Sequence, residues 1–305
     1  MSEPERRCGF FAIIGAPNAG KSTLLNRVVG AKIAIVTPKV QTTRNRIIGI
    51  ALHGAAQLVF IDTPGIFAPT RRLERAMVEA AWGGVADTDG IVLLIDAHAA
   101  RNGVPDKDAQ AIVAKLKQQN RRAVVILNKI DAVDRAMLLN LAAWIDAQGI
   151  ADSVFMISAL NGDGVNDLLD DLAAHAPPGP WHYPEDQLSE VPLRQLASEI
   201  TREKLFLGLR QELPYALTVE TETWEERNDG SVKIDQVIYV RRDSQKKIVL
   251  GKGGQQIKKV GAEARADLEN ILARRVHLFL FVKVRDNWVD DPERYRAMGL
   301  DFPKG

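Results

Sequence analysis

The chain has 305 residues, of which 46% are hydrophobic and 26% are charged. This composition excludes disordered and collagen-like chains and leaves room for about two globular domains. The formal net charge is only +1 at pH 7, so any surface for nucleic acid has to be a local basic patch. Cys8 is the single cysteine, which excludes an internal disulfide and a cysteine-based zinc site and suits a reducing cytosol. The start of the chain shows no signal-peptide pattern, and no apolar stretch approaches the roughly 20 residues of a membrane span.

Short apolar runs alternate with longer amphipathic stretches from Gly9 to about His175. The runs are FFAII, QLVFI, GIVLLID, AVVIL and SVFMI, and RLERAMVEAAW and DAQAIVAKLKQQ are typical of the stretches between them. This alternation predicts an α/β domain at 1–176, with a mostly parallel sheet and helices on both faces. The proline-rich stretch APPGPWHYPEDQLSE follows, and since neither a helix nor a central strand tolerates it, we predict a linker at 177–190.

Beyond the linker, residues 191–305 predict a smaller α+β domain with the order α-β-β-α-α-β. The expected elements are a helix (VPLRQLASEITREKLFLGLR), two strands (YALTVETETW and VKIDQVIYVRR), a helix across GKGG, another helix (EARADLENILARR) and a last strand (VHLFLFVKV). The final stretch, DPERYRAMGLDFPKG, has no role that its residues assign.

The stretch GAPNAGKS at 15–22 fits the phosphate-loop pattern G-x-x-x-x-G-K-[ST] and lies between an apolar strand and the predicted helix KSTLLNRVV. Backbone N–H groups of such a loop converge on phosphate oxygens, Lys21 adds a positive charge for the β- and γ-phosphates, and Ser22 can reach a Mg²⁺ ion. A plain glycine turn would not need a strand and a helix on these two sides.

Three further polar stretches each close an apolar run: DTPG at 62–65, NKID at 128–131 and SAL at 158–160. Loops that follow parallel strands meet at one sheet edge, where open α/β folds bind their ligands. Asp62 is placed to hold Mg²⁺ directly or through water. Asp131 can accept hydrogen bonds from a ring N–H and an exocyclic amine on one edge, a donor pair that guanine has and adenine lacks, and Asn128 and the Ser158–Ala159 backbone complete the pocket.

The stretch VQTTRNRIIG at 40–49 lies where nucleotide switches carry a hydroxyl that joins the Mg²⁺ shell while the γ-phosphate is present. Thr43 is our first choice for that hydroxyl and Thr42 the second. The residue after DTPG is Ile66, which cannot orient an attacking water, so intrinsic hydrolysis is expected to be slow. Simple packing is the alternative role for Ile66.

The candidate residues fall into four groups. The nucleotide-binding group is Gly15, Ala16, Pro17, Asn18, Ala19, Gly20, Lys21, Ser22, Thr23, Asp62, Thr63, Pro64, Gly65, Asn128, Lys129, Asp131, Ser158, Ala159 and Leu160. Catalysis is assigned to Lys21, Thr43 and Gly65, and Mg²⁺ binding to Ser22, Thr43 and Asp62. The RNA-binding group is Lys246, Lys247, Gly251, Lys252, Gly253, Gly254, Lys258 and Lys259.

The RNA-binding group centres on GKGG at 251–254, which is too short for a nucleotide loop and has no hydroxyl residue after its lysine. Between two predicted helices of an α-β-β-α-α-β order, it matches the GXXG loop of a type II KH domain, which clamps the backbone of about four nucleotides. Residues 241–261 carry seven basic residues against one acidic residue, whereas 181–230 carry five against eleven. A solvated helix face is the ordinary reading of a charge run, but its coincidence with GKGG favours RNA. The five histidines are scattered and predict neither a metal site nor a triad.

The ordered motifs resemble those of the phosphate-loop GTPases. With QTTRNRIIGI, EKLFLGLRQELPY, GKGGQQIKKVGAEAR and VHLFLFVKVRDNWVDD, nearly the whole chain resembles the Era family of bacterial ribosome-assembly GTPases, within the TrmE-Era-EngA-YihA-Septin-like group. The resemblance implies binding near the 3′ end of 16S ribosomal RNA, a role in 30S subunit assembly, and cytoplasmic localisation with some peripheral inner-membrane association. The spelling PNAGKS is similar to that of potassium-activated GTPases, which makes Asn18 a candidate K⁺ ligand, although an asparagine in a turn needs no such role.

Two alternatives remain open at this point. PNAGKS and TTR are shared with tRNA-modification and large-subunit assembly GTPases, but the sequence shows neither a second GTPase domain nor a cysteine-bearing modification domain. A non-enzymatic RNA-binding module with a structural GTP site is the other alternative, and multiple turnover of GTP would exclude it.

Overall fold

The computed structural model describes residues 5–39, 46–69, 72–86, 88–209 and 213–285. Contacts divide these residues into two compact units. The first takes residues 5–34 and 46–190 of the described chain, and the second takes 35–39 and 191–285. The predicted linker, 177–190, therefore lies within the first unit. Thr42 and Thr43 lie outside the described residues.

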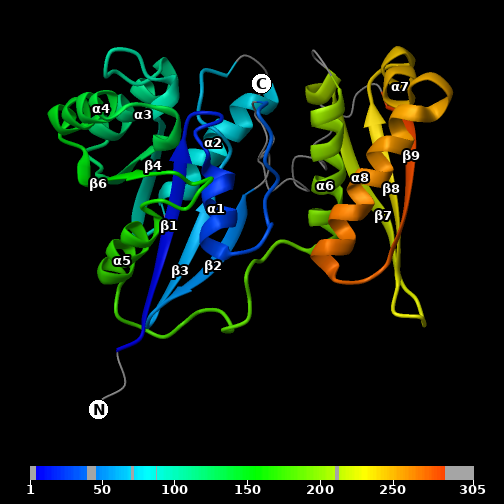
Figure 1. The fold of residues 1–305 in the computed structure, drawn as a ribbon, viewed down its shortest axis with the longest axis horizontal. Helices are drawn as coiled ribbons and strands as arrows, with labels where there is room; N and C mark the ends of the chain where they lie inside the picture. Colours follow the sequence, from blue (N-terminus) through cyan, green and yellow to red (C-terminus); the bar gives the residue numbers. More distant parts are fainter. Residues whose placement is uncertain (1–4, 40–45, 70–71, 87, 210–212, 286–305) are drawn as a thin grey trace. The chain divides into compact units, whose positions relative to one another are not determined.

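The first unit is built on a six-stranded sheet with the strand order β2-β3-β1-β4-β5-β6 (Figure 1). Its strands are β1 (Arg7–Gly15), β2 (Ile47–His53), β3 (Ala56–Asp62), β4 (Gly90–Asp96), β5 (Ala123–Asn128) and β6 (Ala151–Ile157). Every neighbouring pair is parallel except β2 and β3. Strands β3 and β4 are almost wholly buried because helices cover both faces of the sheet, which explains their nearly continuous apolar sequence.

Five helices cover this sheet: α1 (Lys21–Val29), α2 (Arg72–Ala86), α3 (Lys107–Gln118), α4 (Arg135–Gln148) and α5 (Val165–His175). One core cluster joins α2, α3 and α4 to one face, while α1 and α5 contact β1, β2 and β3. Local chemistry fixes the helix ends. Asp106 and Asp134 accept hydrogen bonds from the first-turn N–H groups of α3 and α4, and Gly30 ends α1 in the left-handed conformation.

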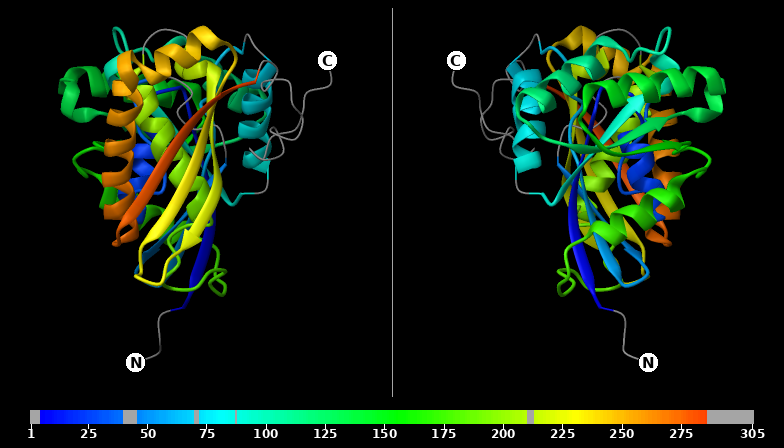
Figure 2. Two further views of the ribbon diagram at one scale, coloured as in Figure 1. Left: turned by 90° about the vertical axis from the view of Figure 1, so that its right-hand side faces the viewer. Right: turned by 90° about the vertical axis from the view of Figure 1, so that its left-hand side faces the viewer.

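The second unit has the predicted order α-β-β-α-α-β. Its elements are α6 (Leu193–Gly208), β7 (Leu217–Glu226), β8 (Val232–Val240), α7 (Asp243–Leu250), α8 (Gln255–Leu272) and β9 (Val276–Val284). The sheet order is β7-β8-β9, with β7 and β8 antiparallel and β8 and β9 parallel. Figures 1 and 2 show α6 and α8 on one side of this sheet. On β9, Phe279 and Phe281 remain 46% and 52% exposed.

The fold class is confirmed, and two elements differ from the sequence-based expectation. Residues 47–53 form β2, whereas the sequence predicts only a switch segment at 40–49, before the strand QLVFI. The helix does not run across GKGG, because Gly251, Gly253 and Gly254 have φ values of 72°, 58° and 76°. A new helix, α8, starts at Gln255 and absorbs both QQIKKVG and most of the helix predicted at 262–275.

Candidate functional site

The loop between β1 and α1 has a backbone that requires its glycines. Gly20 precedes the first residue of α1 with φ 100° and ψ 18°, and Asn18 has φ 63°. A Cβ atom on Gly20 would lie 2.2 Å from Nδ2 of Asn128. The loop and the base-side loop therefore approach so closely at this point that only glycine fits.

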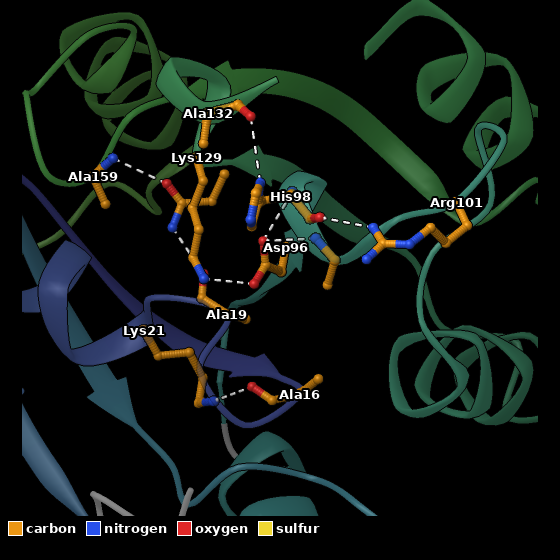
Figure 3. A network of polar contacts seen from close by, with 11 residues as sticks. Ala16, Ala19, Lys21, Asp96, His98, Arg101, Lys129, Ala132 and Ala159 are labelled. Atoms are coloured by element: carbon orange, nitrogen blue, oxygen red, sulfur yellow. Dashed lines mark hydrogen bonds and ion pairs between the residues drawn. The ribbon is translucent and has the colours of Figure 1, made fainter. Parts of the chain in front are cut away.

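Lys21 is buried, with 6% of its surface exposed, at the start of α1. Its Nζ donates hydrogen bonds to the carbonyl oxygens of Gly15 and Ala16 at 3.1 and 2.9 Å (Figure 3). Burial lowers the pKa of this lysine to about 8, and the nearby carboxylate of Asp62 opposes the shift. An anion at the loop would therefore stabilise the charged form of Lys21.

Ser22 and Asp62 lie together although they are 40 residues apart in sequence. The Ser22 hydroxyl donates to Oδ2 of Asp62 at 3.0 Å, and Asp62 is fully buried at the end of β3. Next to it, the Thr63 hydroxyl donates to the Ile13 carbonyl at 2.9 Å, which joins the DTPG loop to β1. A hydroxyl and a buried carboxylate at this spacing fit Mg²⁺, which prefers oxygen ligands and keeps waters. Within the described ranges, no group of three or more His, Cys, Asp or Glu residues could hold a metal.

Asn128 connects three of the predicted loops. Its Nδ2 donates to the Ala19 carbonyl at 2.8 Å, and its Oδ1 accepts a hydrogen bond from the Ala159 N–H at 3.0 Å. The side chain is only 2% exposed. The carboxamide thus ties the phosphate loop, NKID and SAL to one another, as their common position at the carboxyl ends of β1, β5 and β6 predicts.

Lys129 and Asp96 form an ion pair that sequence reasoning missed. The Lys129 ammonium lies 2.5 Å from Oδ2 of Asp96, while Oδ1 accepts hydrogen bonds from the N–H groups of His98 and Ala99 at 2.9 and 3.2 Å (Figure 3). The signal was present, because Asp96 closes the apolar run GIVLLID just as Asp62 closes QLVFID. Arg27 was missed as well: it donates to the carbonyls of Ala159 and Leu160 and so holds the SAL loop.

The remaining base-side residues differ in exposure. Asp131 is exposed on a short turn after β5, so its carboxylate is accessible to a ligand. Ser158 is fully buried and its hydroxyl accepts from the Asn161 N–H at 3.2 Å, whereas Leu160 is 66% exposed.

Gly65 and Ile66 have different surroundings. A Cβ atom on Gly65 would lie 3.1 Å from the backbone of Pro17, so the DTPG loop approaches the phosphate loop closely. The Ile66 N–H donates to the Gly15 carbonyl at 3.1 Å. The Ile66 side chain is 6% exposed and belongs to the core cluster with α2, α3 and α4. Ile66 therefore has a packing role.

In the second unit, GKGG forms a tight corner between α7 and α8. A Cβ atom on Gly251 would lie 2.7 Å from Cβ of Gln256, so a side chain is excluded there, whereas Gly253 and Gly254 have open space around them. Lys247, Lys252, Lys258 and Lys259 are exposed around this corner and Lys246 is half-buried. Lys259 lies 3.8 Å from Glu263 in an exposed pair, which contributes little. The predicted basic patch therefore lies around the loop.

Comparison with known proteins agrees with these two sites. A family described as a 50S ribosome-binding GTPase matches residues 10–129, and the KH domain family matches residues 212–289. GTPase Era of Rhizobium meliloti is 62% identical over 298 residues, which cover 98% of this chain and 94% of that protein. GTPase Era of Agrobacterium fabrum is 61% identical, with 98% of this chain and 93% of that protein covered. The chain belongs to the Era family of GTPases.

Two solved Era structures share the fold over almost the whole chain. A point variant of Aquifex aeolicus Era bound to GDP·AlF4⁻ has a TM-score of 0.88 and 36% identity, covering 96% of this chain and 99% of that one. A complex of Era with MgGDPNP and nucleotides 1506–1542 of 16S ribosomal RNA has a TM-score of 0.89 and 35% identity, with the same coverage. As a member of the Era family, the protein is a GTPase with a KH domain. Among the described residues, no helix is both long and apolar enough to cross a membrane.

Proposed function

We propose that this Era-family GTPase is a GTP-dependent switch that binds the 3′ region of 16S ribosomal RNA and assists assembly of the 30S subunit. The observation that carries the proposal is the presence, in one chain, of hydrogen-bonded guanine-nucleotide loops and a GXXG corner surrounded by exposed lysines. A relative of 35% identity forms a complex with MgGDPNP and nucleotides 1506–1542 of that RNA. We propose residues 1–176 as the GTPase domain, 177–190 as the linker and 191–305 as the KH domain with its tail.

The nucleotide would lie along the carboxyl ends of β1, β3, β5 and β6. Lys21 and the N–H groups of 15–23 would hold the phosphates, and Asp131 would accept from the guanine edge. Ser22 and Asp62, with Thr43, would hold Mg²⁺, which when bound neutralises charge on the phosphates. Asn128 keeps the phosphate and base loops in register, so substrate positioning is built in before binding.

Hydrolysis would depend mainly on positioning and on fixed positive groups. Lys21 and the loop N–H groups would lie where charge develops on the phosphates. The buried Ile66 cannot orient a water molecule. A slow intrinsic rate follows from this site, and Gly65 would act through the N–H group of its loop.

The RNA would be held by the GKGG corner. Gly253 and Gly254 leave open space where a sugar–phosphate backbone can approach, and the five surrounding lysines supply positive charge. If GTP and RNA select the same state of the protein, each raises the affinity for the other by the same factor.

Potassium dependence is a finer part of the proposal. Asn18 is exposed on the phosphate loop with φ 63°, where its side-chain oxygen can serve as a ligand for K⁺ beside the phosphates. GTP hydrolysis should then be faster in KCl than in NaCl, and Asn18→Ala should remove the difference. Equal wild-type rates in the two salts would refute this role.

A cytoplasmic location with peripheral inner-membrane association is also proposed, on the resemblance to Era proteins alone. Fractionation of cells tests it, since a wholly membrane-extracted or exported protein would contradict it.

The test of the main proposal is RNA binding by fluorescence anisotropy, with a GTP analogue and with GDP. The probe is an RNA from the 3′ region of 16S ribosomal RNA. We expect Lys252→Glu/Lys258→Glu to weaken binding at least about tenfold, because two phosphate contacts become repulsive. Lys107→Glu/Lys117→Glu on α3 is the matched control, since it makes the same change of net charge on a helix of the first unit. Equal losses in the two variants would reject GKGG as the RNA clamp.

A further inference from the structure

The linker is fastened to the first unit by one buried side chain. Gln57 is fully buried on β3, within a strand that is otherwise apolar up to its final aspartate. Its Oε1 accepts hydrogen bonds from the N–H groups of His182 and Tyr183 at 2.9 and 3.0 Å, and its Nε2 donates to the Tyr183 carbonyl at 2.9 Å. A buried amide that satisfies three main-chain groups of one segment fixes that segment's position.

Other contacts hold the same part of the linker. The Trp181 indole N–H donates to the Ala55 carbonyl at 3.1 Å, and the Arg6 guanidinium lies 4.9 Å from the centre of that ring. The ring of His182 meets the ring of Phe10 edge-on at 5.3 Å. Residues 181–183 are therefore anchored on the beginnings of β1 and β3, and we call them the anchor.

The next part of the linker is bonded to a different strand. The Ile50 N–H donates to the Leu188 carbonyl at 2.9 Å, the Ser189 hydroxyl donates to the Ile48 carbonyl at 2.7 Å, and the Glu190 N–H donates to the same carbonyl at 3.4 Å. Residues 188–190 thus run antiparallel along the outer edge of β2, and we call them the rider.

One side chain connects the anchor to the rider. The Tyr183 hydroxyl donates to Oε1 of Glu190 at 2.7 Å. Burial, followed by the bond to Glu190, raises the pKa of Tyr183 to about 12, so the phenol keeps its proton and stays a donor at neutral pH.

The position of β2 gives this arrangement a consequence. Strand β2 begins at Ile47, directly after the segment in which we place the first switch, and the second unit begins at Val191, directly after the rider. The shortest path between Arg46 and Val191 therefore runs through the first residues of β2 and their hydrogen bonds to 189 and 190. A ligand shifts an equilibrium only through contacts that differ between two states, and this path offers such contacts.

We propose that the linker is a lever: the anchor holds one end on β3, while the rider carries nucleotide-dependent movement of β2 to the KH domain. The inference rests on the proposed function, since it requires RNA affinity to depend on the bound nucleotide. The anchor makes the movement directional, because a free tether would absorb it.

The test compares RNA affinity in the GTP-analogue and GDP forms, with the same 16S 3′-region RNA, for the full chain. Gln57→Leu removes the anchor, and Tyr183→Phe with Ser189→Ala loosens the rider without a buried change. We expect the GDP to GTP-analogue ratio of dissociation constants to fall at least about fivefold in both variants, with kcat for GTP within about twofold of wild type. Gln148→Leu, which removes a glutamine bond within α4, is the control and should keep the wild-type ratio.

Amide hydrogen exchange gives a second readout. The N–H groups of His182 and Tyr183 should be equally protected in both nucleotide states, whereas those of Ile50 and Glu190 should differ between the states. If Gln57→Leu fails to fold, the Tyr183→Phe/Ser189→Ala variant and the exchange data decide. Unchanged ratios in both variants, or equal exchange at 50 and 190 in both states, would overturn the lever. A wild-type ratio of one would overturn the proposed switch itself, so the two failures are distinguishable.

Discussion

The ammonium of Lys129 lies 2.5 Å from Oδ2 of Asp96, so the ends of β4 and β5 are joined by an ion pair beside the base-side loop. Asp96 is 8% exposed, and its other oxygen caps the turn at 97–99. We expect Asp96→Asn to weaken GDP and GTP-analogue binding about tenfold, because the cap survives but Lys129 loses its charged partner. Nucleotide titration measures this.

The control for Asp96→Asn is Asp106→Asn. Asp106 caps α3 through the same pattern of bonds, to the N–H groups of Asp108 and Ala109 at 2.9 and 3.1 Å, and it caps a helix that carries none of the nucleotide loops. Equal nucleotide affinity in the two variants would show that the ion pair has no part in positioning Lys129.

Lys21 predicts opposite pH effects on binding and on stability. Its pKa of about 8 in the nucleotide-free protein lies below the ordinary 10.5, so the ammonium is lost as the pH rises above 8. We expect GDP affinity to fall between about pH 7.5 and pH 9. Between about pH 8 and 10.5 the unfolded chain binds more protons, so the nucleotide-free protein should gain stability as the pH rises through that window. Titrations and melts of wild type and Lys21→Met check both effects, since the variant should lack them.

Gly20→Ala should abolish tight nucleotide binding. The new methyl group would lie 2.2 Å from Nδ2 of Asn128, which would be pushed off the Ala19 and Ala159 backbone groups. Gly30→Ala is a matched control, because Gly30 has φ 74° but nothing within 4 Å of a Cβ atom. The backbone strain alone should lower the free energy of unfolding by about 1–2 kcal/mol in the control. A similar loss of GDP affinity in both variants would show that strain, not the collision, matters.

Ile66→Gln should not accelerate GTP hydrolysis. The side chain at 66 is buried in the core with α2, α3 and α4, so a glutamine there would lie among apolar groups instead of facing the phosphates. We expect a loss of about 1–3 kcal/mol in the free energy of unfolding and an unchanged or lower kcat. A rise in kcat of about tenfold under multiple turnover would place the side chain at the phosphate after all.

Much of the nucleotide site could be predicted from the sequence because its residues follow strands. Each parallel strand delivers its last residues to the same sheet edge, and so Asp62, Asn128 and Ala159 meet the phosphate loop although they are far apart in the chain. The order of the second unit could be predicted for a related reason, since each element there has a clear apolar period.

Other features depend on partners that spacing does not reveal. Gln57 looks like a polar interruption of QLVFI, and its partner, the Tyr183 backbone, lies 126 residues away. The strand at 47–53 was missed because its pairing with β3 is antiparallel and decided by tertiary contact. Asp96 was missed because its partner is a lysine of another loop, not a ligand.

The position of residues 188–190 also bears on the solubility of the protein. Strand β2 is the last strand on its side of the sheet, and an uncovered edge strand offers unpaired N–H and C=O groups to any other chain. The backbone and the hydroxyl of the linker bond to Ile48 and Ile50 along this edge. A chain that ended before Leu188 would expose it, and would be expected to self-associate through edge-to-edge strand pairing.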